Sequence, residues 1–124
     1  MLIKTMLALA AVLIFTSHVS AVEMKERSAG IEATLKVAPE KSMVDLFLKD
    51  YSKALKQIKS AKVKAAVKTP DGKTIEKELI GMEMEGVFSY MNSLDLSKKG
   101  GYIFDIAVDV DGVKRGFSFR YENR

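Results

Sequence analysis

The sequence predicts an all-β protein, a seven-stranded antiparallel immunoglobulin-like β-sandwich that follows an N-terminal signal peptide. From Gly30 onward, apolar residues alternate with polar ones at a period of two, as in strands that bury one face. Turn-forming pairs separate these short runs at regular intervals, with hardly any helical pattern between them. An open barrel is the alternative arrangement of the same strands.

Residues 1–21 have the layout of a secretory signal peptide. Lys4 precedes an uncharged apolar run over residues 6–15, and a small-residue exit follows at residues 19–21. The apolar run is too short for a membrane-spanning helix, which needs roughly 20 residues. No cysteine follows it to carry a lipid. We therefore expect cleavage after Ala21 and a soluble mature protein in the periplasm or outside the cell, without a transmembrane segment.

After the signal peptide we expect a flexible leader over residues 22–29 and one immunoglobulin-like domain over residues 30–124. The leader shows no periodicity. The first two strands of the domain are expected at 31–37 and 43–49. Pro39 should separate them, because proline has no N–H to give to a strand ladder.

Residues 50–60 do not fit the strand pattern. Three apolar residues recur there at helical spacing: Tyr51, Leu55 and Ile58. Asp50 or Ser52 could cap the start of a helix. We expect this segment to be either a long loop or a single short helix that links two strands.

Five more strands are expected in the second half of the domain: 61–68, 74–84, 87–92, 102–110 and 113–121. The last two should form a hairpin, because Asp111 and Gly112 tolerate the positive φ angles of a two-residue type I′ turn. Four side chains of this hairpin should lie in the core: Phe104, Ile106, Phe117 and Phe119. Tyr102, two residues after Gly100, is placed to hydrogen-bond back across a corner, as a tyrosine does in such sandwiches.

The composition argues against several classes of function. Cysteine is absent, and the only histidine, His18, lies in the signal peptide. The mature chain therefore lacks the usual zinc ligands, the common general base and a thiol nucleophile, and we expect that it is not an enzyme. It keeps 19 basic and 16 acidic side chains. This small net positive charge does not indicate nucleic-acid binding.

Two segments of the chain resemble a known family. The segments "KVKAAVKTPDGKTIEKEL" and "KKGGYIFDIAVDVDGVKRGFSFRY" are similar to the small periplasmic domains called YtkA-like or FixH-like. The resemblance implies an immunoglobulin-type sandwich and a link to metal-export or respiratory-assembly systems. Many members carry a Met-rich, His-containing stretch in the middle, where this chain has Met82, Met84 and Met91 but no histidine.

These three methionines are the candidate metal ligands. Thioethers are soft donors that suit copper(I) or silver(I), and Met82 and Met84 lie two residues apart, which on a strand is about 7 Å on one face. Met91 could lie opposite them as a third ligand. The interpretation that we favour is packing, because Ile80, Met82 and Met84 alternate with Gly81 and two glutamates as a buried face would. Packing predicts buried methionines, whereas a metal site or a partner-binding surface predicts exposed ones.

The sequence thus predicts a non-enzymatic exported module that docks on an envelope protein or complex and needs no cofactor. The alternative function is a soft-metal protein that binds copper(I) or silver(I) through the methionine cluster. Nothing in the sequence identifies the partner or the oligomeric state.

Overall fold

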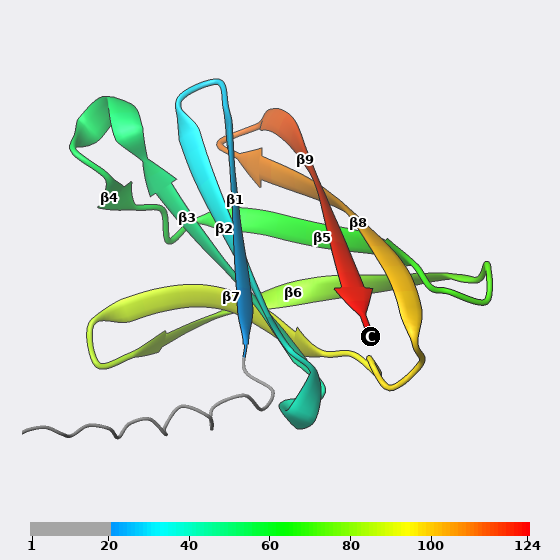
Figure 1. The fold of residues 1–124 in the computed structure, drawn as a ribbon. Helices are drawn as coiled ribbons and strands as arrows, with labels where there is room; N and C mark the ends of the chain where they lie inside the picture. Colours follow the sequence, from blue (N-terminus) through cyan, green and yellow to red (C-terminus); the bar gives the residue numbers. More distant parts are fainter. Residues whose placement is uncertain (1–20) are drawn as a thin grey trace, which may run out of the picture.

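The computed structural model describes residues 21–124, so the expected signal peptide lies outside the described residues apart from its last residue. The described chain is all-β and antiparallel (Figure 1). Its nine strands are β1 (Val22–Ser28), β2 (Ile31–Ala38), β3 (Met43–Asp50), β4 (Lys56–Gln57), β5 (Ala61–Lys68), β6 (Thr74–Met84), β7 (Val87–Ser93), β8 (Gly100–Val110) and β9 (Val113–Asn123). Within this range, no helix has the length and apolar character needed to cross a membrane.

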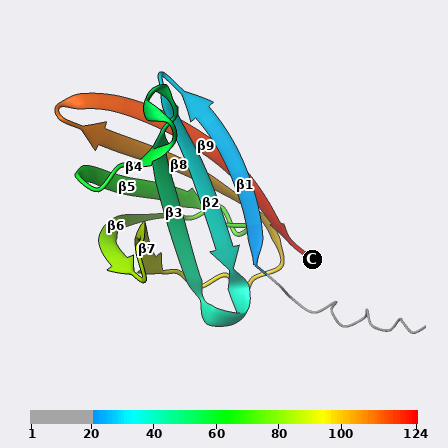
Figure 2. The ribbon, with the colours of Figure 1, turned by 90° about the vertical axis from the view of Figure 1, so that its left-hand side faces the viewer.

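The strands form one sheet that nearly closes into a barrel. Their order is β1-β2-β3-β7-β6-β5-β8-β9, with the short β4 paired to β3. The two end strands, β1 and β9, lie beside each other (Figures 1 and 2). The expectation of a seven-stranded immunoglobulin-like sandwich is therefore corrected, and the open barrel describes the fold better.

β6 is the reason that the sheet is continuous. Its first part, Thr74–Leu79, pairs with β5, and its second part, Ile80–Met84, pairs with β7. One long strand thus belongs to both halves of the fold, whereas a sandwich would keep two separate sheets. All seven strands expected from the sequence are present, and two more were missed.

The first missed strand is β1, which occupies the range expected to be a flexible leader. It pairs with β2 over its whole length, from Val22 opposite Val37 to Ser28 opposite Ile31. Apolar and polar residues do not alternate clearly along this strand. Met24 is its one side chain that packs against the core, and most of the strand is exposed. Main-chain pairing, which is independent of side-chain pattern, holds this strand in place.

The second missed strand, β4, lies in the ambiguous segment over residues 50–60. The expected short helix is a single 3₁₀ turn, Tyr51–Lys53, and the Asp50 side chain accepts a hydrogen bond from the Ser52 N–H at 3.0 Å. Ala54 and Leu55 then adopt positive φ angles of 56° and 59°, which ends the turn. β4 follows and pairs with the end of β3. A second 3₁₀ turn, Pro39–Lys41, links β2 and β3.

The core fills the inside of the barrel. The four side chains expected there are confirmed as buried, with exposed fractions of 0% for Phe104, 2% for Ile106, 5% for Phe117 and 4% for Phe119. The β8–β9 hairpin has the expected turn, since Asp111 and Gly112 have φ angles of 53° and 82°. The Gly112 N–H donates to the Asp109 carboxylate at 2.9 Å, which fixes this turn further.

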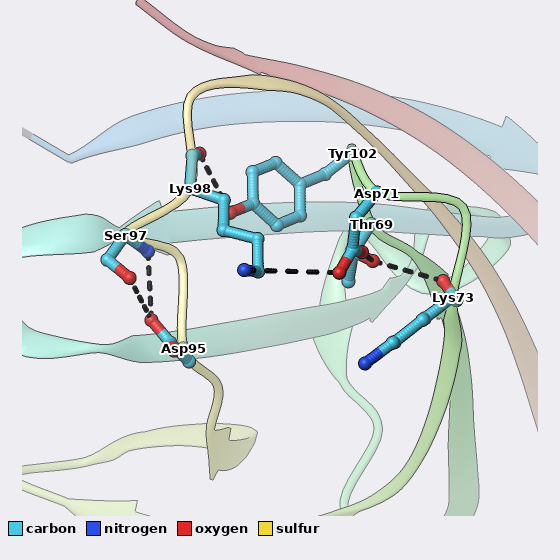
Figure 3. A network of polar contacts seen from close by, with 7 residues as sticks. All are labelled: Thr69, Asp71, Lys73, Asp95, Ser97, Lys98 and Tyr102. Atoms are coloured by element: carbon cyan, nitrogen blue, oxygen red, sulfur yellow. Dashed lines mark hydrogen bonds and ion pairs between the residues drawn. The ribbon is translucent and has the colours of Figure 1, made fainter.

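A polar network holds the corner before β8 (Figure 3). The Tyr102 hydroxyl donates to the Lys98 carbonyl at 2.9 Å, as the sequence predicted for a corner tyrosine. The Lys98 ammonium lies 3.9 Å from the Asp71 carboxylate in the β5–β6 turn, where Thr69 hydrogen-bonds to Asp71. The Ser97 main chain and side chain both donate to Asp95. These contacts join two loops, so we assign the network to the fold and not to catalysis.

Acid should weaken this corner. Hydrogen bonds from Thr69 and Ser97 hold the pKa values of Asp71 and Asp95, respectively, below the ordinary value. A carboxylate with a lowered folded-state pKa stabilises the fold above its unfolded-state pKa, and that contribution is lost as the pH falls through the folded-state pKa. We therefore expect the double variant Asp71→Asn, Asp95→Asn to lose less stability than the parent between roughly pH 5 and pH 2. Thermal unfolding at each pH measures this, and equal acid sensitivity would contradict it.

Candidate functional site

The candidate methionines lie on the outer face of the barrel, on the β6–β7 hairpin. Met82 is 46% exposed and Met84 is 62% exposed, and Met91 is half-buried. Ile80 and Val87 beside them are also about half exposed. The packing interpretation that we favoured is therefore wrong for Met82 and Met84.

The inner face of β6 explains this outcome. Leu79 is buried there, and the next inward position is Gly81, which lies against the rings of Phe88 and Tyr90. A Cβ on Gly81 would lie 2.8 Å from the Phe88 ring. The aromatic side chains of β7 thus fill the core next to β6, so the apolar residues of β6 at the alternate positions face outward.

The register shows which methionines can act together. Met84 lies opposite Val87, Met82 opposite Ser89, and Met91 opposite Ile80. Met82 and Met91 are thus diagonal neighbours on one face, with Cα atoms about 7–8 Å apart. Met84 is roughly 14 Å from Met91 at strand spacing. The three thioethers therefore do not meet at one point, and only Met82 and Met91 are close.

Sequence reasoning missed the other neighbour of Met91, which is Asp45 on β3. The two residues are direct partners across the β3–β7 ladder, and Met43 lies two residues before Asp45 on the same outer face. A signal for this face was present in the sequence. Val44, Leu46 and Leu48 take the buried positions of β3, so a methionine and a phenylalanine remain on its outward side.

Asp45 has an unusual environment for an outward carboxylate. Its Oδ1 atom is shielded from solvent and has no hydrogen-bond partner among the described residues. Burial raises the pKa of Asp45 above the ordinary value, although Lys36 and Lys41 act in the opposite direction. Loss of hydration without a compensating hydrogen-bond donor destabilises the charged form of a carboxylate. A bound cation would supply the missing partner.

β3 and β7 separate beyond Leu46, and β4 fills the gap. The ladder between β3 and β7 ends at Leu46 and Tyr90. From β4, the Gln57 side chain donates to the Gly86 carbonyl at 2.9 Å and accepts from the Phe88 N–H at 2.6 Å. An open groove of about 380 Å³ runs over this junction, with Phe47, Val87 and Phe88 among its lining residues. Charged and polar side chains line the rest of the groove, among them Glu23, Lys25, Glu32 and Lys49, and no methionine of the described chain contributes to it.

The chemistry of this face suits a soft ion. No group of three His, Cys, Asp or Glu side chains that could hold a metal exists among residues 21–124. A site here would combine the Asp45 carboxylate with the neutral thioether of Met91 and that of either Met43 or Met82. Thioethers select copper(I) over hard cations such as calcium or magnesium.

Comparisons with known proteins show the fold. No family model and no curated protein matches the sequence. A crystal structure of a DUF4426 family protein from Pseudomonas aeruginosa PAO1 is similar, with a TM-score of 0.64 and 19% identity, over 81% of this chain and 93% of that chain. The YtkA-like or FixH-like resemblance stays a prediction.

Two further similar structures are of proteins from other bacteria. FetP of uropathogenic Escherichia coli strain F11, expressed in the periplasm, has a TM-score of 0.62 and 11% identity, over 84% of this chain and 93% of that chain. Copper-reconstituted P19 from Campylobacter jejuni has a TM-score of 0.64 and 8% identity, over 83% and 94%. A variant of FetP is also known with bound copper.

Proposed function

We propose that this chain is an exported, non-enzymatic protein that binds copper(I) on the outer face of its barrel. Met91 and Asp45 form the centre of the site, and Met43 and Met82 lie on opposite sides of it as alternative further thioether donors. One observation carries the proposal. The Asp45 Oδ1 atom is shielded and has no hydrogen-bond donor within the described part of the chain, and Asp45 lies directly opposite a methionine in the ladder.

The geometry suits a small, flexible ligand set. Met43 and Met82 are each diagonal neighbours of Met91, so their Cα atoms lie about 7–8 Å from that of Met91. Methionine side chains are long and unbranched, so the thioether of Met91 and that of one diagonal neighbour can turn toward one ion. Met43 lies opposite Ser93 and Met82 opposite Ser89, four residues apart along β7, so these two are alternative donors. The carboxylate would offset the charge of the ion, which in turn would replace the partner that Asp45 lacks.

Two further observations support the proposal. P19 and a variant of FetP, which share this fold, have been crystallised with copper. The N-terminal sequence has the layout of a signal peptide, and an exported protein without cysteine needs thioethers for soft-metal binding. Histidine cannot contribute to the site, because no histidine follows residue 18.

Copper(I) should bind the purified mature protein in a one-to-one complex and raise its melting temperature. A ligand that binds only the folded state stabilises it by an amount that grows with the logarithm of ligand concentration over Kd. The protein for this test is the exported form, whose intact mass should lack residues 1–21. Met91→Leu keeps the apolar volume and should lose less than about 1.5 kcal/mol of stability, but it should abolish the copper-induced rise.

Two variants make this test specific. Asp45→Asn should weaken copper binding, and without metal it should melt no lower than the parent, because it removes a negative charge with an unpartnered oxygen. Met84→Leu is the matched control, since it changes a methionine on the same face that lies beyond reach of the site. A parent protein that shows no copper-induced rise, or a Met91→Leu variant that keeps it, would overturn the proposal.

A second candidate function is the docking module predicted from the sequence. The observation that favours it is the apolar strip on the β6–β7 hairpin, in which four large side chains are about half exposed: Ile80, Met82, Met84 and Val87. Contiguous apolar surface of this kind commonly marks an interaction site. Docking through the strip should be weakened by Met82→Lys and unaffected by Val113→Lys, which changes an equally exposed residue on the β8–β9 hairpin.

A further inference from the structure

We propose that the free edge of β6 over residues 80–84 pairs with the same segment of a second copy of this chain. The two segments would run antiparallel around a two-fold axis through Met82, so that the sheets of both copies join. This proposal is independent of copper binding, because it rests on the main chain of β6 and not on the Asp45 site.

Among residues 21–124, no strand pairs with this edge, because the two neighbours of β6 end at different places. The ladder with β5 stops at Val63 opposite Leu79, whereas the ladder with β7 continues to Met84 opposite Val87. All five residues of the segment are exposed, Gly81 included. The inner side of Gly81 is covered by aromatic rings, so the part of Gly81 that is exposed is its main chain. Figure 1 shows this end of the β6–β7 hairpin extending away from β8 and β9.

The hairpin turn determines which main-chain groups face this edge. Glu85 and Gly86 have φ angles of 53° and 82°, as in a two-residue type I′ turn. Such a turn is closed by a hydrogen-bonded pair, here Met84 and Val87, and hydrogen-bonded pairs alternate along an antiparallel ladder. The N–H and C=O groups of Gly81 and Glu83 must therefore point away from β7, toward the free edge.

A contact on the other side of the hairpin agrees with this alternation. The Phe88 N–H points away from β6 and donates to Gln57 on β4. Phe88 lies opposite Glu83, so its main-chain groups and those of Glu83 should face opposite edges. The free edge thus offers two donors and two acceptors at the spacing of a strand, which is what an added strand requires.

Self-complementarity identifies the occupant as a second copy. Pairing centred on Met82 places Gly81 opposite Glu83 of the second copy. In each copy, these are the two residues whose main-chain N–H and C=O groups point toward the free edge. Centring on Glu83 would oppose two glutamates, which is unfavourable. A two-fold axis at Gly81 would place Glu83 opposite Leu79 of the second copy, but the main chain of Leu79 already pairs with β5. One register remains.

The side chains fit the same register. On the outer face, Ile80 would lie opposite Met84 of the second copy, and the two Met82 side chains would lie opposite each other, so every pair is apolar. On the inner face, Glu83 would lie opposite a glycine and would keep its ion pair with Lys59, whose Nζ is 3.4 Å from the Glu83 carboxylate. The adjoining strips of the two copies would shield part of the Met82 and Met84 side chains from water. An interface this small predicts a weak dimer, with a Kd on the order of 10–100 µM.

Cross-linking tests the register. The chain contains no cysteine, so Met82→Cys would carry a single thiol. Residues at a two-fold axis in a non-hydrogen-bonded pair have Cα atoms about 4.5 Å apart, which is within the range for a disulfide. We expect Met82→Cys to form a covalent dimer under mild oxidation. The control Val113→Cys places a thiol at a similarly exposed position on another hairpin and should remain mainly monomeric.

Sedimentation of the metal-free protein tests the association itself. The parent should show a concentration-dependent dimer, and Met82→Lys should weaken it about tenfold or more, because it opposes two like charges at the axis. Val113→Lys and Asp45→Asn should dimerise like the parent, which separates this proposal from copper binding. A parent that stays monomeric to about 1 mM, or equal cross-linking of the two cysteine variants, would overturn the proposal. So would an edge that binds a different protein while the chain itself remains monomeric.

Discussion

Phe104→Ala is expected to lower the free energy of unfolding by about 3–5 kcal/mol. Phe104 is fully buried at the centre of β8, between Val67 on β5 and Phe119 on β9. Truncation removes the transfer free energy of the ring and leaves a cavity that strands fixed on both sides can fill only in part. The protein has no disulfide to compensate for such a loss. Urea denaturation at neutral pH measures the change.

The matched control is the next residue along the strand. Asp105 points to the outer face and is exposed, so Asp105→Ala should change stability by no more than about 0.5 kcal/mol. Asp109 is a poorer control, because its carboxylate accepts a hydrogen bond from the Gly112 N–H in the turn. Similar losses from Phe104→Ala and Asp105→Ala would show that the faces of β8 are assigned wrongly.

Tyr90→Phe should have the second-largest effect, a loss of roughly 2–4 kcal/mol. The buried Tyr90 hydroxyl donates to the Ile58 carbonyl at 2.8 Å and accepts from the Ala61 N–H at 3.1 Å. Removing this one oxygen leaves two main-chain groups without partners, and each unsatisfied buried group costs about 1–3 kcal/mol. The ring remains, so no cavity contributes to the loss.

Tyr51→Phe is the control for the hydroxyl change. Tyr51 is 39% exposed in the 3₁₀ turn after β3, so removal of its hydroxyl should have little effect. Chemical denaturation of both variants gives the comparison. A Tyr90→Phe variant as stable as Tyr51→Phe would mean that water replaces the hydroxyl, and that the link between β4 and β5 does not depend on Tyr90.

Tyr90 also connects the core to the two proposed functional features. It is the inward neighbour of Met91 along β7, and it lies opposite Gly81 at the free edge of β6. Loosening the loop over residues 58–61 should therefore disturb both the copper site and the edge. For that reason Met91→Leu and Met82→Lys, which change the outer face alone, are the better tests of function.

The copper site and the proposed dimer share one residue, Met82. In the dimer, the two Met82 side chains would lie side by side at the axis, and each would remain a diagonal neighbour of Met91 in its own copy. The two proposals stay separable, because Asp45→Asn affects only the copper site. Copper that strengthens dimerisation in the parent but not in Asp45→Asn would show that the two features are coupled.

Local sequence pattern determined seven of the nine strands of this protein and its last hairpin turn. The alternation of apolar residues located the seven long strands, and the Asp111-Gly112 pair specified the last hairpin turn. The same alternation identified the core residues of β8 and β9, and the position of Tyr102 predicted its bond to Lys98. These features depend on residues close in sequence or on the side-chain period of a strand, which a single sequence displays directly.

Tertiary structure alone decided the strand order and the site. β1 and β4 were missed because main-chain ladders hold them, and a ladder leaves little trace in side-chain pattern. The methionines of β6 are exposed because Phe88 and Tyr90 of another strand fill the core beside Gly81. Asp45 and Met91 are 46 residues apart in sequence, and only the register of β3 against β7 brings them together. Which strand pairs with which, and at what offset, is set by the packing of the whole barrel and cannot be read from any one segment.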